Sequence, residues 1–262
     1  MTPPTFADPA AYERYVGRWS RSVAPEFLAW LGVPAHRRWL DVGCGTGALT
    51  ETVLALSDPE AVTGVDPSAS FVADAAARVT DPRAGFRVGD ARALPLADST
   101  VDAVVSALVL NFVPEPAVAV AEFARVTRPG GLAAAYVWDY AQGMGLIRHF
   151  WDAAVLLDPA AAELDEGRRM PVCAPDPLRA LWTDAGFTEV RTEALVIQTP
   201  FADFADYWEP FLGGQGPAPG YVRSLGDVHR SRLRDLLASR LPVGPDGTIP
   251  LTARAWAVRG RR

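Results

Sequence analysis

The chain has 262 residues, 49% hydrophobic and 21% charged, which are fractions typical of folded globular proteins and exclude disordered and collagen-like chains. At about 150 residues per domain, this length predicts one elaborated domain. All 25 residues of the Lys+Arg count are arginines, so lysine chemistry such as Schiff-base formation is excluded, and the net charge of -6 argues against a nucleic-acid partner.

Short apolar runs alternate with segments of helical periodicity along most of the chain. One or two aromatic-rich helices are predicted at residues 10–31. We then predict strands at 38–42, 61–66, 86–88, 101–106, 132–138, 190–197 and 249–258, and helices at 48–56, 68–79 (with Ser68 as N-cap), 116–126, 142–166, 178–185 and, around a loop at 213–217, 201–241. Residues 128–131, Arg-Pro-Gly-Gly, are expected to turn the chain into its fifth strand. The alternation predicts an α/β fold with a doubly wound, mostly parallel sheet, and two helical inserts on its ligand side.

Alternate glycines, Gly43, Gly45 and Gly47, join the first predicted strand to the helix that follows. Glycine permits a tight turn and close approach of a ligand, and N–H groups at a helix start favour an anionic group. A dinucleotide-binding turn would place its third glycine at Ala48, where alanine is permitted. The turn alone therefore predicts a cofactor and leaves a dinucleotide open.

Three carboxylates follow the first three strands in turn. Asp41 ends the first, Asp66 lies 25 residues later at the end of the second, and Asp90 follows the third after a further 24 residues. A carboxylate at the second position can accept both hydroxyls of a ribose, and one at the third can accept from an adenine amine. Three acids suit an adenosine attached to a cationic amino-acid chain better than a pyrophosphate.

Four motifs now stand in order over residues 38–140: LDVGCGTG at 40–47, GVDPS at 64–68, GDA at 89–91 and RVTRPGG at 125–131. In sequence and spacing they resemble the class I S-adenosylmethionine-dependent methyltransferases, and most closely the type 11 branch that acts on small molecules. The resemblance implies a seven-stranded Rossmann-like sheet and S-adenosyl-L-methionine as cofactor. It also implies an N-terminal helical lid at 1–35, a cofactor-binding core at 36–140, and inserts and last strands at 141–262 that form a substrate lid.

The resemblance further implies a role for each residue of these motifs. The turn of Gly43, Cys44, Gly45 and Gly47 lies under the methionine moiety, and Asp41 holds its amino end through water or the backbone. Asp66, with Pro67 beside it, takes the ribose; Asp90 and Ala91 take the adenine; Ser106, at the end of the fourth strand, offers its carbonyl to the ammonium. In similar enzymes a helix before the first strand closes over the cofactor, so Tyr15 and Arg18 are candidates for the methionine carboxylate, with a packed amphipathic helix as the alternative.

Candidates near the reaction centre follow the fourth and fifth strands. Asn111 can orient an acceptor, although many relatives carry a histidine about there, and Asp139, Tyr140 or His149 is expected to assist deprotonation when the acceptor needs it. Large aromatic side chains of the late helices are expected to wall the substrate chamber or to form core: Trp151, Trp182, Phe201, Phe204, Tyr207, Trp208, Phe211 and Tyr221.

Cys44 and Cys173 are too few for a disulfide scaffold, and a nucleophilic role for Cys44 is disfavoured because no histidine lies near it. No metal site is expected, since the three histidines lack ligand spacing. We expect a cytoplasmic, bacterial enzyme that transfers a methyl group by in-line displacement to a small, apolar or aromatic metabolite, without a nucleic-acid or membrane partner. A methyltransferase acting on protein or RNA, and a cofactor-binding protein without transferase activity, remain alternatives; the oligomeric state is not specified by the sequence.

Overall fold

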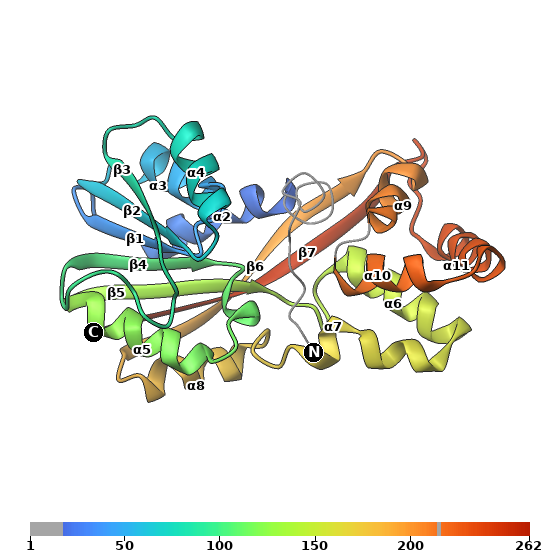
Figure 1. The fold of residues 1–262 in the computed structure, drawn as a ribbon. Helices are drawn as coiled ribbons and strands as arrows, with labels where there is room; N and C mark the ends of the chain where they lie inside the picture. The colour runs from blue at the N-terminus through green and yellow to red at the C-terminus, as the bar shows by residue number, and fades with distance from the viewer. Residues whose placement is uncertain (1–17, 214–215) are drawn as a thin grey trace. The chain divides into compact units, whose positions relative to one another are not determined.

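The computed structural model of the protein describes residues 18–213 and 216–262, and its elements follow the predicted alternation (Figure 1). In chain order they are α2 (Arg18–Leu31), β1 (Arg38–Val42), α3 (Ala48–Leu56), β2 (Ala61–Asp66), α4 (Ala69–Arg78), β3 (Ala84–Val88), β4 (Val101–Ala107), the 3-10 helix η2 (Leu110–Phe112), α5 (Pro116–Val126), β5 (Thr127–Trp138), α6 (Gly145–Leu157), the 3-10 helix η3 (Pro159–Leu164), α7 (Glu166–Arg169), α8 (Pro175–Asp184), β6 (Thr188–Phe201), α9 (Phe204–Leu212), α10 (Pro217–Ser224), α11 (Asp227–Arg240) and β7 (Ile249–Arg261).

The strands form one seven-stranded sheet in the order β3-β2-β1-β4-β5-β7-β6. The pairs β2/β3, β1/β2, β1/β4 and β4/β5 are parallel. Strand β7 runs antiparallel to β5, because Gly130 donates its N–H to the carbonyl of Arg262 while Arg262 donates to that of Gly131. The predicted doubly wound, mostly parallel sheet is confirmed, and the strand order reverses between β1 and β4, where ligands of such sheets bind.

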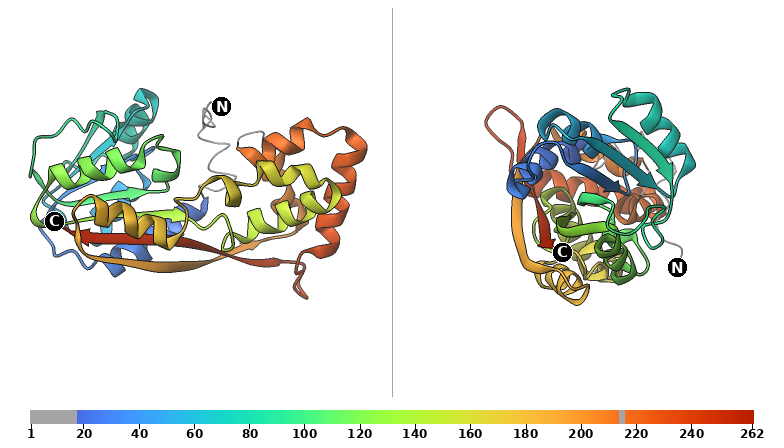
Figure 2. Two further views of the ribbon diagram at one scale, coloured as in Figure 1. Left: turned by 90° about the horizontal axis from the view of Figure 1, so that it is seen from below. Right: turned by 90° about the vertical axis from the view of Figure 1, so that its left-hand side faces the viewer.

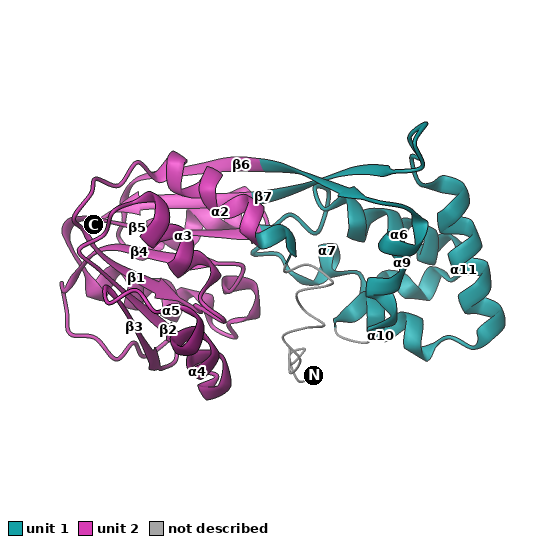
Figure 3. Cartoon of the chain, turned by 90° about the horizontal axis from the view of Figure 1, so that it is seen from above, with its two compact units in different colours: residues 1–20, 138–173, 196–255 teal, residues 21–137, 174–195, 256–262 magenta. Residues whose placement is uncertain are grey.

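The chain divides into two compact units (Figure 3). Unit 2 comprises residues 21–137, 174–195 and 256–262, and unit 1 comprises residues 1–20, 138–173 and 196–255. The predicted cofactor-binding core thus lies in unit 2 up to residue 137. That residues 1–262 form a single domain stays a prediction.

In unit 2, helices α3 and α4 lie on one face of the sheet and α5 and α8 on the other (Figure 1). Trp182 of α8 is fully buried, packs edge-on against Phe123 of α5 and donates its indole N–H to the carbonyl of Ala133 at 2.9 Å. Of the two roles expected for Trp182, chamber wall or core, the structure therefore supports the core. Its indole packs a helix onto the sheet, which the sequence pattern alone did not distinguish from a late insert.

Unit 1 contains the two predicted helical blocks, α6–α7 and α9–α11, which lie together in the views of Figure 2. Their core is aromatic: the rings of Phe150 and Phe211 stack with centroids 4.5 Å apart, and the hydroxyl of Tyr207 donates to the carbonyl of Leu146 at 3.0 Å. The rings of Phe150, Tyr207 and Phe211 are all fully buried. The inserts are thus held by their own hydrophobic core.

Residues 128–131 lie within β5, which begins at Thr127 and not at Leu132 as predicted, and the chain turns inside the strand at these residues. Gly130 takes a positive φ of 77°, and the register shifts between Val101 and Ala103 of the neighbouring strand. The pairing with Arg262 keeps this segment in the sheet, and a partner so far along the chain left no mark on the local sequence.

The predicted N-terminal helices are described from Arg18 onward, as α2, and Tyr15 lies outside the described residues. Strands β6 and β7 are longer than predicted, and β4 extends one residue beyond Ser106. In the part of the chain that the structure describes, no helix combines the length and the apolar character needed to cross a bilayer.

Candidate functional site

The glycine turn between β1 and α3 has the left-handed backbone that its glycines permit. Gly43, Gly45 and Gly47 have φ values of 74°, 52° and 89°, in the left-handed region that favours glycine. A Cβ at Gly43 would lie 2.3 Å from Cγ2 of Val109, whereas one at Gly45 would meet nothing within 4 Å. The turn is therefore packed against the protein at Gly43 and open at Gly45.

Four N–H groups of this turn donate to acceptors inside the protein. Gly43 and Cys44 both donate to the carbonyl of Val65, and Gly47 donates to that of Cys44. Gly45 donates to Oδ2 of Asp66 at 3.0 Å. Because the turn already binds a carboxylate of its own chain, it fits a pyrophosphate poorly, and the dinucleotide alternative loses its main support.

Asp41, near the carboxyl end of β1, is fully buried. Its Oδ2 accepts from the hydroxyl of Thr50 at 2.7 Å, and its Oδ1 has no hydrogen-bond partner among the described residues. Burial, with a smaller contribution from the charge of Asp66, raises the pKa of Asp41 to about 7. A buried carboxylate with a vacant acceptor is costly unless a donor reaches it, so this oxygen fits the amino group of a ligand.

Asp66 ends β2 and is 7% exposed. Its Oδ2 accepts from Gly45 N–H and its Oδ1 from Ser68 N–H at 2.9 Å, and burial raises its pKa. Two backbone bonds fix the plane of the carboxylate, while each oxygen keeps a second lone pair. That orientation fits the two neighbouring hydroxyls of a ribose. Ser68 is the predicted N-cap of α4, and accepts from Phe71 N–H.

Asp90 follows β3 and is half exposed, with an arginine partner that was not predicted. Arg92 donates from Nη2 to Oδ2 at 2.7 Å and from Nε to Oδ1 at 3.1 Å, and these hydrogen bonds lower the pKa of Asp90. Ala91 beside it is buried. Asp90 is thus ionised and held in place, and its role toward an adenine stays a prediction.

The remaining predicted cofactor residues of unit 2 lie around the same strand ends. Ser106 is buried in β4, and its hydroxyl donates to the carbonyl of Val42 at 2.8 Å, which ties β4 to the end of β1. Pro67 is exposed. Burial and the charges of Asp41 and Asp66 raise the pKa of the Cys44 thiol, so that the side chain is an uncharged thiol and a poor nucleophile.

The predicted catalytic residues fall in both units. Asn111 belongs to η2 in unit 2, whereas Asp139, Tyr140 and His149 belong to unit 1. Asp139 is 3% exposed and accepts from Nε of Arg254 at 2.7 Å and from Gln142 N–H at 2.9 Å. Tyr140 is buried as well. Burial lowers the pKa of His149 on α6.

Arg18, predicted to bind the methionine carboxylate, lies at the start of α2 in unit 1. Its Nη1 is 2.9 Å from Oδ1 of Asp206, and its guanidinium lies 4.5 and 4.7 Å from the ring centroids of Trp19 and Phe201. Its Nε and Nη2 are buried without a hydrogen-bond partner in the described part of the chain. Arginine donors thus remain available in an aromatic setting, and the role of Arg18 stays a prediction.

Thr50 is a site residue that the sequence analysis missed. It is fully buried on α3, and its hydroxyl is the hydrogen-bond donor to Asp41. The sequence did contain a signal for this role, because Thr50 is a polar residue on the apolar face of the predicted helix, three residues before Val53. Within residues 18–213 and 216–262, no three His, Cys, Asp or Glu side chains gather as they would around a metal ion.

Fold and site together define a class of protein: a doubly wound α/β domain whose acidic strand ends suit a ribose and a cationic group. Residues 40–135 match a family model described as a methyltransferase domain. Over 121 residues the chain is 41% identical to an uncharacterised methyltransferase of Mycobacterium tuberculosis, a match that covers 46% of each chain, so it spans less than half the length of that relative. Residues 40–135, which carry the glycine turn and the acidic strand ends, are therefore similar to methyltransferase domains.

Two further relatives match most of the chain. A trans-aconitate 2-methyltransferase of Variovorax paradoxus is 27% identical over 252 residues, 92% of each chain. The solved structure of phosphoethanolamine N-methyltransferase 2 from Haemonchus contortus, in complex with phosphomonomethylethanolamine and S-adenosylhomocysteine, has a TM-score of 0.61 at 17% identity, over 97% of this chain and 56% of that one. The second likeness confirms the fold.

Proposed function

We propose that this protein transfers the methyl group of S-adenosylmethionine to a small-molecule acceptor. The observation that carries the proposal is the pair of buried carboxylates, Asp41 and Asp66, at the ends of adjacent strands, with Oδ1 of Asp41 unpartnered among the described residues. When bound, S-adenosylmethionine supplies an electrophilic methyl group on a positively charged sulfur. Asp41 accepts from its ammonium group and Asp66 from its ribose hydroxyls, and both acids add the negative potential that favours a cation.

A small acceptor is supported by the charge and by the relatives. The net charge of -6 disfavours docking on RNA, and the relatives described above are named for trans-aconitate and for phosphoethanolamine. An acceptor on a protein or RNA, or a protein that binds the cofactor without transfer, is the competing function. The free, buried thiols of Cys44 and Cys173 support the further proposal that the enzyme works in the reducing cytoplasm.

Where the acceptor must lose a proton, we propose His149 as the base. Burial lowers its pKa, so the imidazole is neutral at pH 7 and holds a lone pair. Asp139 is a weaker candidate because Arg254 and Gln142 already bind its two oxygens, which makes it an anchor for the segment after β5. Replacing His149 by Ala is expected to lower kcat by about 100-fold and to remove one limb of the pH–rate profile. An unchanged profile would exclude His149, and the exposed His36→Ala is the control.

The function is tested by incubating the protein with methyl-labelled S-adenosylmethionine and separate pools of metabolites, peptides and RNA. Label is expected in the metabolite pool, and Asp66→Ala is expected to abolish its transfer. Label in peptide or RNA would assign the competing acceptor class. Calorimetric titration decides the cofactor: tight binding of a nicotinamide or flavin nucleotide, without affinity for S-adenosylmethionine, would contradict the proposal.

A further inference from the structure

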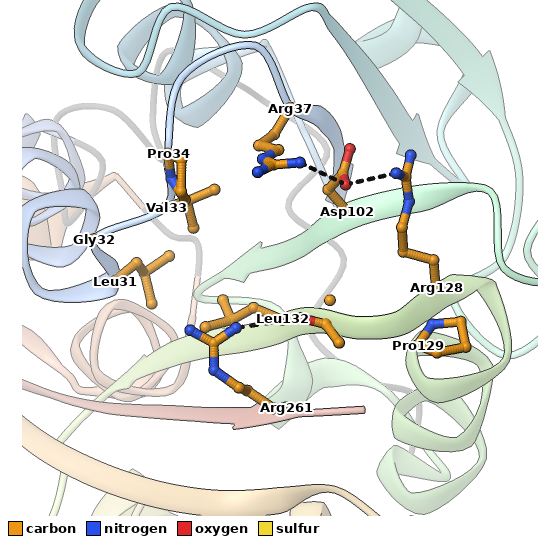
Figure 4. Close-up of a pocket in the computed structure, with 12 residues that line it drawn as sticks. Leu31, Gly32, Val33, Pro34, Arg37, Asp102, Arg128, Pro129, Leu132 and Arg261 are labelled. Atoms are coloured by element: carbon orange, nitrogen blue, oxygen red, sulfur yellow. Dashed lines mark hydrogen bonds and ion pairs between the residues drawn. The ribbon is translucent and has the colours of Figure 1, made fainter.

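A cavity of about 250 Å³ lies in unit 2 at the amino ends of β1, β4 and β5 (Figure 4). Its charged lining consists of Arg37, Asp102, Arg128 and Arg261. Arg37 immediately precedes β1 and Asp102 is the second residue of β4, whereas Asp41 lies near the carboxyl end of β1. Because parallel strands place their two ends at opposite edges of a sheet, this cavity is separate from the cofactor site.

Positive charge exceeds negative charge in this cavity. Asp102, whose side chain is 11% exposed, has Oδ1 3.0 Å from Nη1 of Arg128 and 3.7 Å from Nη1 of Arg37, and its Oδ2 accepts from the N–H of Arg38 at 2.8 Å. The single carboxylate of Asp102 therefore interacts with two guanidinium groups and accepts one backbone hydrogen bond. Since each guanidinium carries five N–H donors, most of those of Arg37 and Arg128 are not used by Asp102.

Arg261 supplies a third guanidinium from β7, across the cavity from Arg37 and Arg128 (Figure 4). Its Nη1 donates to the carbonyl of Gly130 at 3.2 Å, and its Nε lies 3.6 Å from the exposed carboxylate of Glu189. Burial, and then the charges of Arg191 and Arg261, lower the pKa of neighbouring Arg259. The positive potential at this end of β7 is thus incompletely neutralised, in a protein whose net charge is -6.

We propose that this cavity binds a compact, multivalent oxyanion, either a phosphate group or a small polycarboxylate, between Arg37 and Arg128 on one side and Arg261 on the other. Guanidinium groups bind both oxyanions through paired N–H donors, and do so more strongly beside apolar walls such as Leu31 and Leu132. The volume is below the ~300–1,000 Å³ of pockets for drug-sized ligands, so the ligand is smaller than a nucleotide cofactor.

The test is calorimetric titration of the full chain with inorganic pyrophosphate and, separately, with citrate, at constant ionic strength. Saturable 1:1 binding is expected. Replacing Arg261 by Gln, or Arg37 by Gln, is expected to weaken it by about tenfold or more, because each change removes charge-assisted hydrogen bonds. Arg38→Gln is the matched control: it removes the same charge one residue away, but its guanidinium binds Glu60, and the expected change is less than about twofold.

Binding of pyrophosphate alone assigns a phosphate ligand, and binding of citrate alone assigns a polycarboxylate. If neither anion saturates the protein, or if Arg38→Gln weakens binding as much as Arg261→Gln, the proposal is overturned, the latter result indicating diffuse charge. If Arg37→Gln does not fold, Arg261→Gln still tests the proposal, because the Arg261 side chain is half exposed. Circular dichroism checks that the Arg261→Gln variant is folded. The same variants are expected to bind S-adenosylmethionine normally, so failure here is distinct from failure of the proposed function.

Discussion

The two ends of strands β1 and β4 carry buried carboxylates in opposite electrostatic settings. At the carboxyl end of β1, Asp41 has a threonine donor and an oxygen without a partner in the described chain, and burial raises its pKa to about 7. At the amino end of β4, Asp102 is shared by Arg37 and Arg128. A buried acid without a cation creates a site for a cationic ligand, whereas an excess of arginine around one acid creates a site for an anion.

We expect the largest change in cofactor affinity from Asp66→Ala. The variant removes the acceptor of two ribose hydroxyls at the acidic end, so affinity for S-adenosylmethionine should fall by roughly 100-fold or more, measured by calorimetry. Asp74→Ala, which removes an exposed acid on α4, is the matched control and should change affinity by less than about twofold. Equal affinities of the two variants would remove Asp66 from the cofactor site.

The glycine turn allows folding and binding to be separated. Gly43→Ala is expected to lower the free energy of unfolding by about 2 kcal/mol, because the new Cβ meets Val109 at a positive φ. Gly45→Ala carries the φ strain alone, about 1 kcal/mol, yet should weaken cofactor binding by about tenfold, since its methyl group occupies the open side of the turn. Urea unfolding and calorimetry measure the two effects. Wild-type affinity in Gly45→Ala would show that no ligand contacts this side.

The raised pKa of Asp41 predicts two opposite dependences on pH. An ammonium ligand needs the carboxylate, so affinity for S-adenosylmethionine should fall as pH drops below about 7, by up to about tenfold per unit. Without ligand, the folded state binds more protons than the unfolded state between about pH 4 and 7, so the free energy of unfolding should fall as pH rises through this range. Asp41→Asn should remove both dependences, and their persistence would assign them to another group.

We expect the smallest effect from the arginines at the amino ends of β1 and β4 on cofactor affinity at the carboxyl ends. Arg37→Gln and Arg261→Gln should change affinity for S-adenosylmethionine by less than about twofold. Five residues of β1 span roughly 16 Å, which exceeds the Debye length of ~8–10 Å in physiological salt. A larger change, in titrations at constant ionic strength, would show that the two ends are coupled through the sheet.

Sequence reasoning located the elements that local chemistry specifies. Apolar runs, the glycine turn and the Ser68 cap gave β1, β2, α3 and α4 nearly to the residue. Sequence reasoning was incomplete where a residue far away in the sequence determines how a segment pairs or packs. The sequence places the start of the fifth strand after residues 128–131, whereas pairing with Arg262 includes them in β5. It also leaves Trp182 as either chamber wall or core, and only the structure shows that this indole anchors α8 to the sheet.

The order of residues by itself determined the strand–turn–helix pattern, the positions of Asp41, Asp66 and Asp90 at or just beyond the ends of successive strands, and the resemblance to methyltransferases, because periodicity and spacing are properties of neighbouring residues. Only the tertiary structure decided which of these acids has a partner: Thr50 for Asp41, the turn's own N–H for Asp66, and Arg92 for Asp90. It alone also gathered three arginines from distant segments, Arg37, Arg128 and Arg261, around one cavity. The energy of a charge depends on its burial and neighbours, and the neighbours come together only when the chain folds.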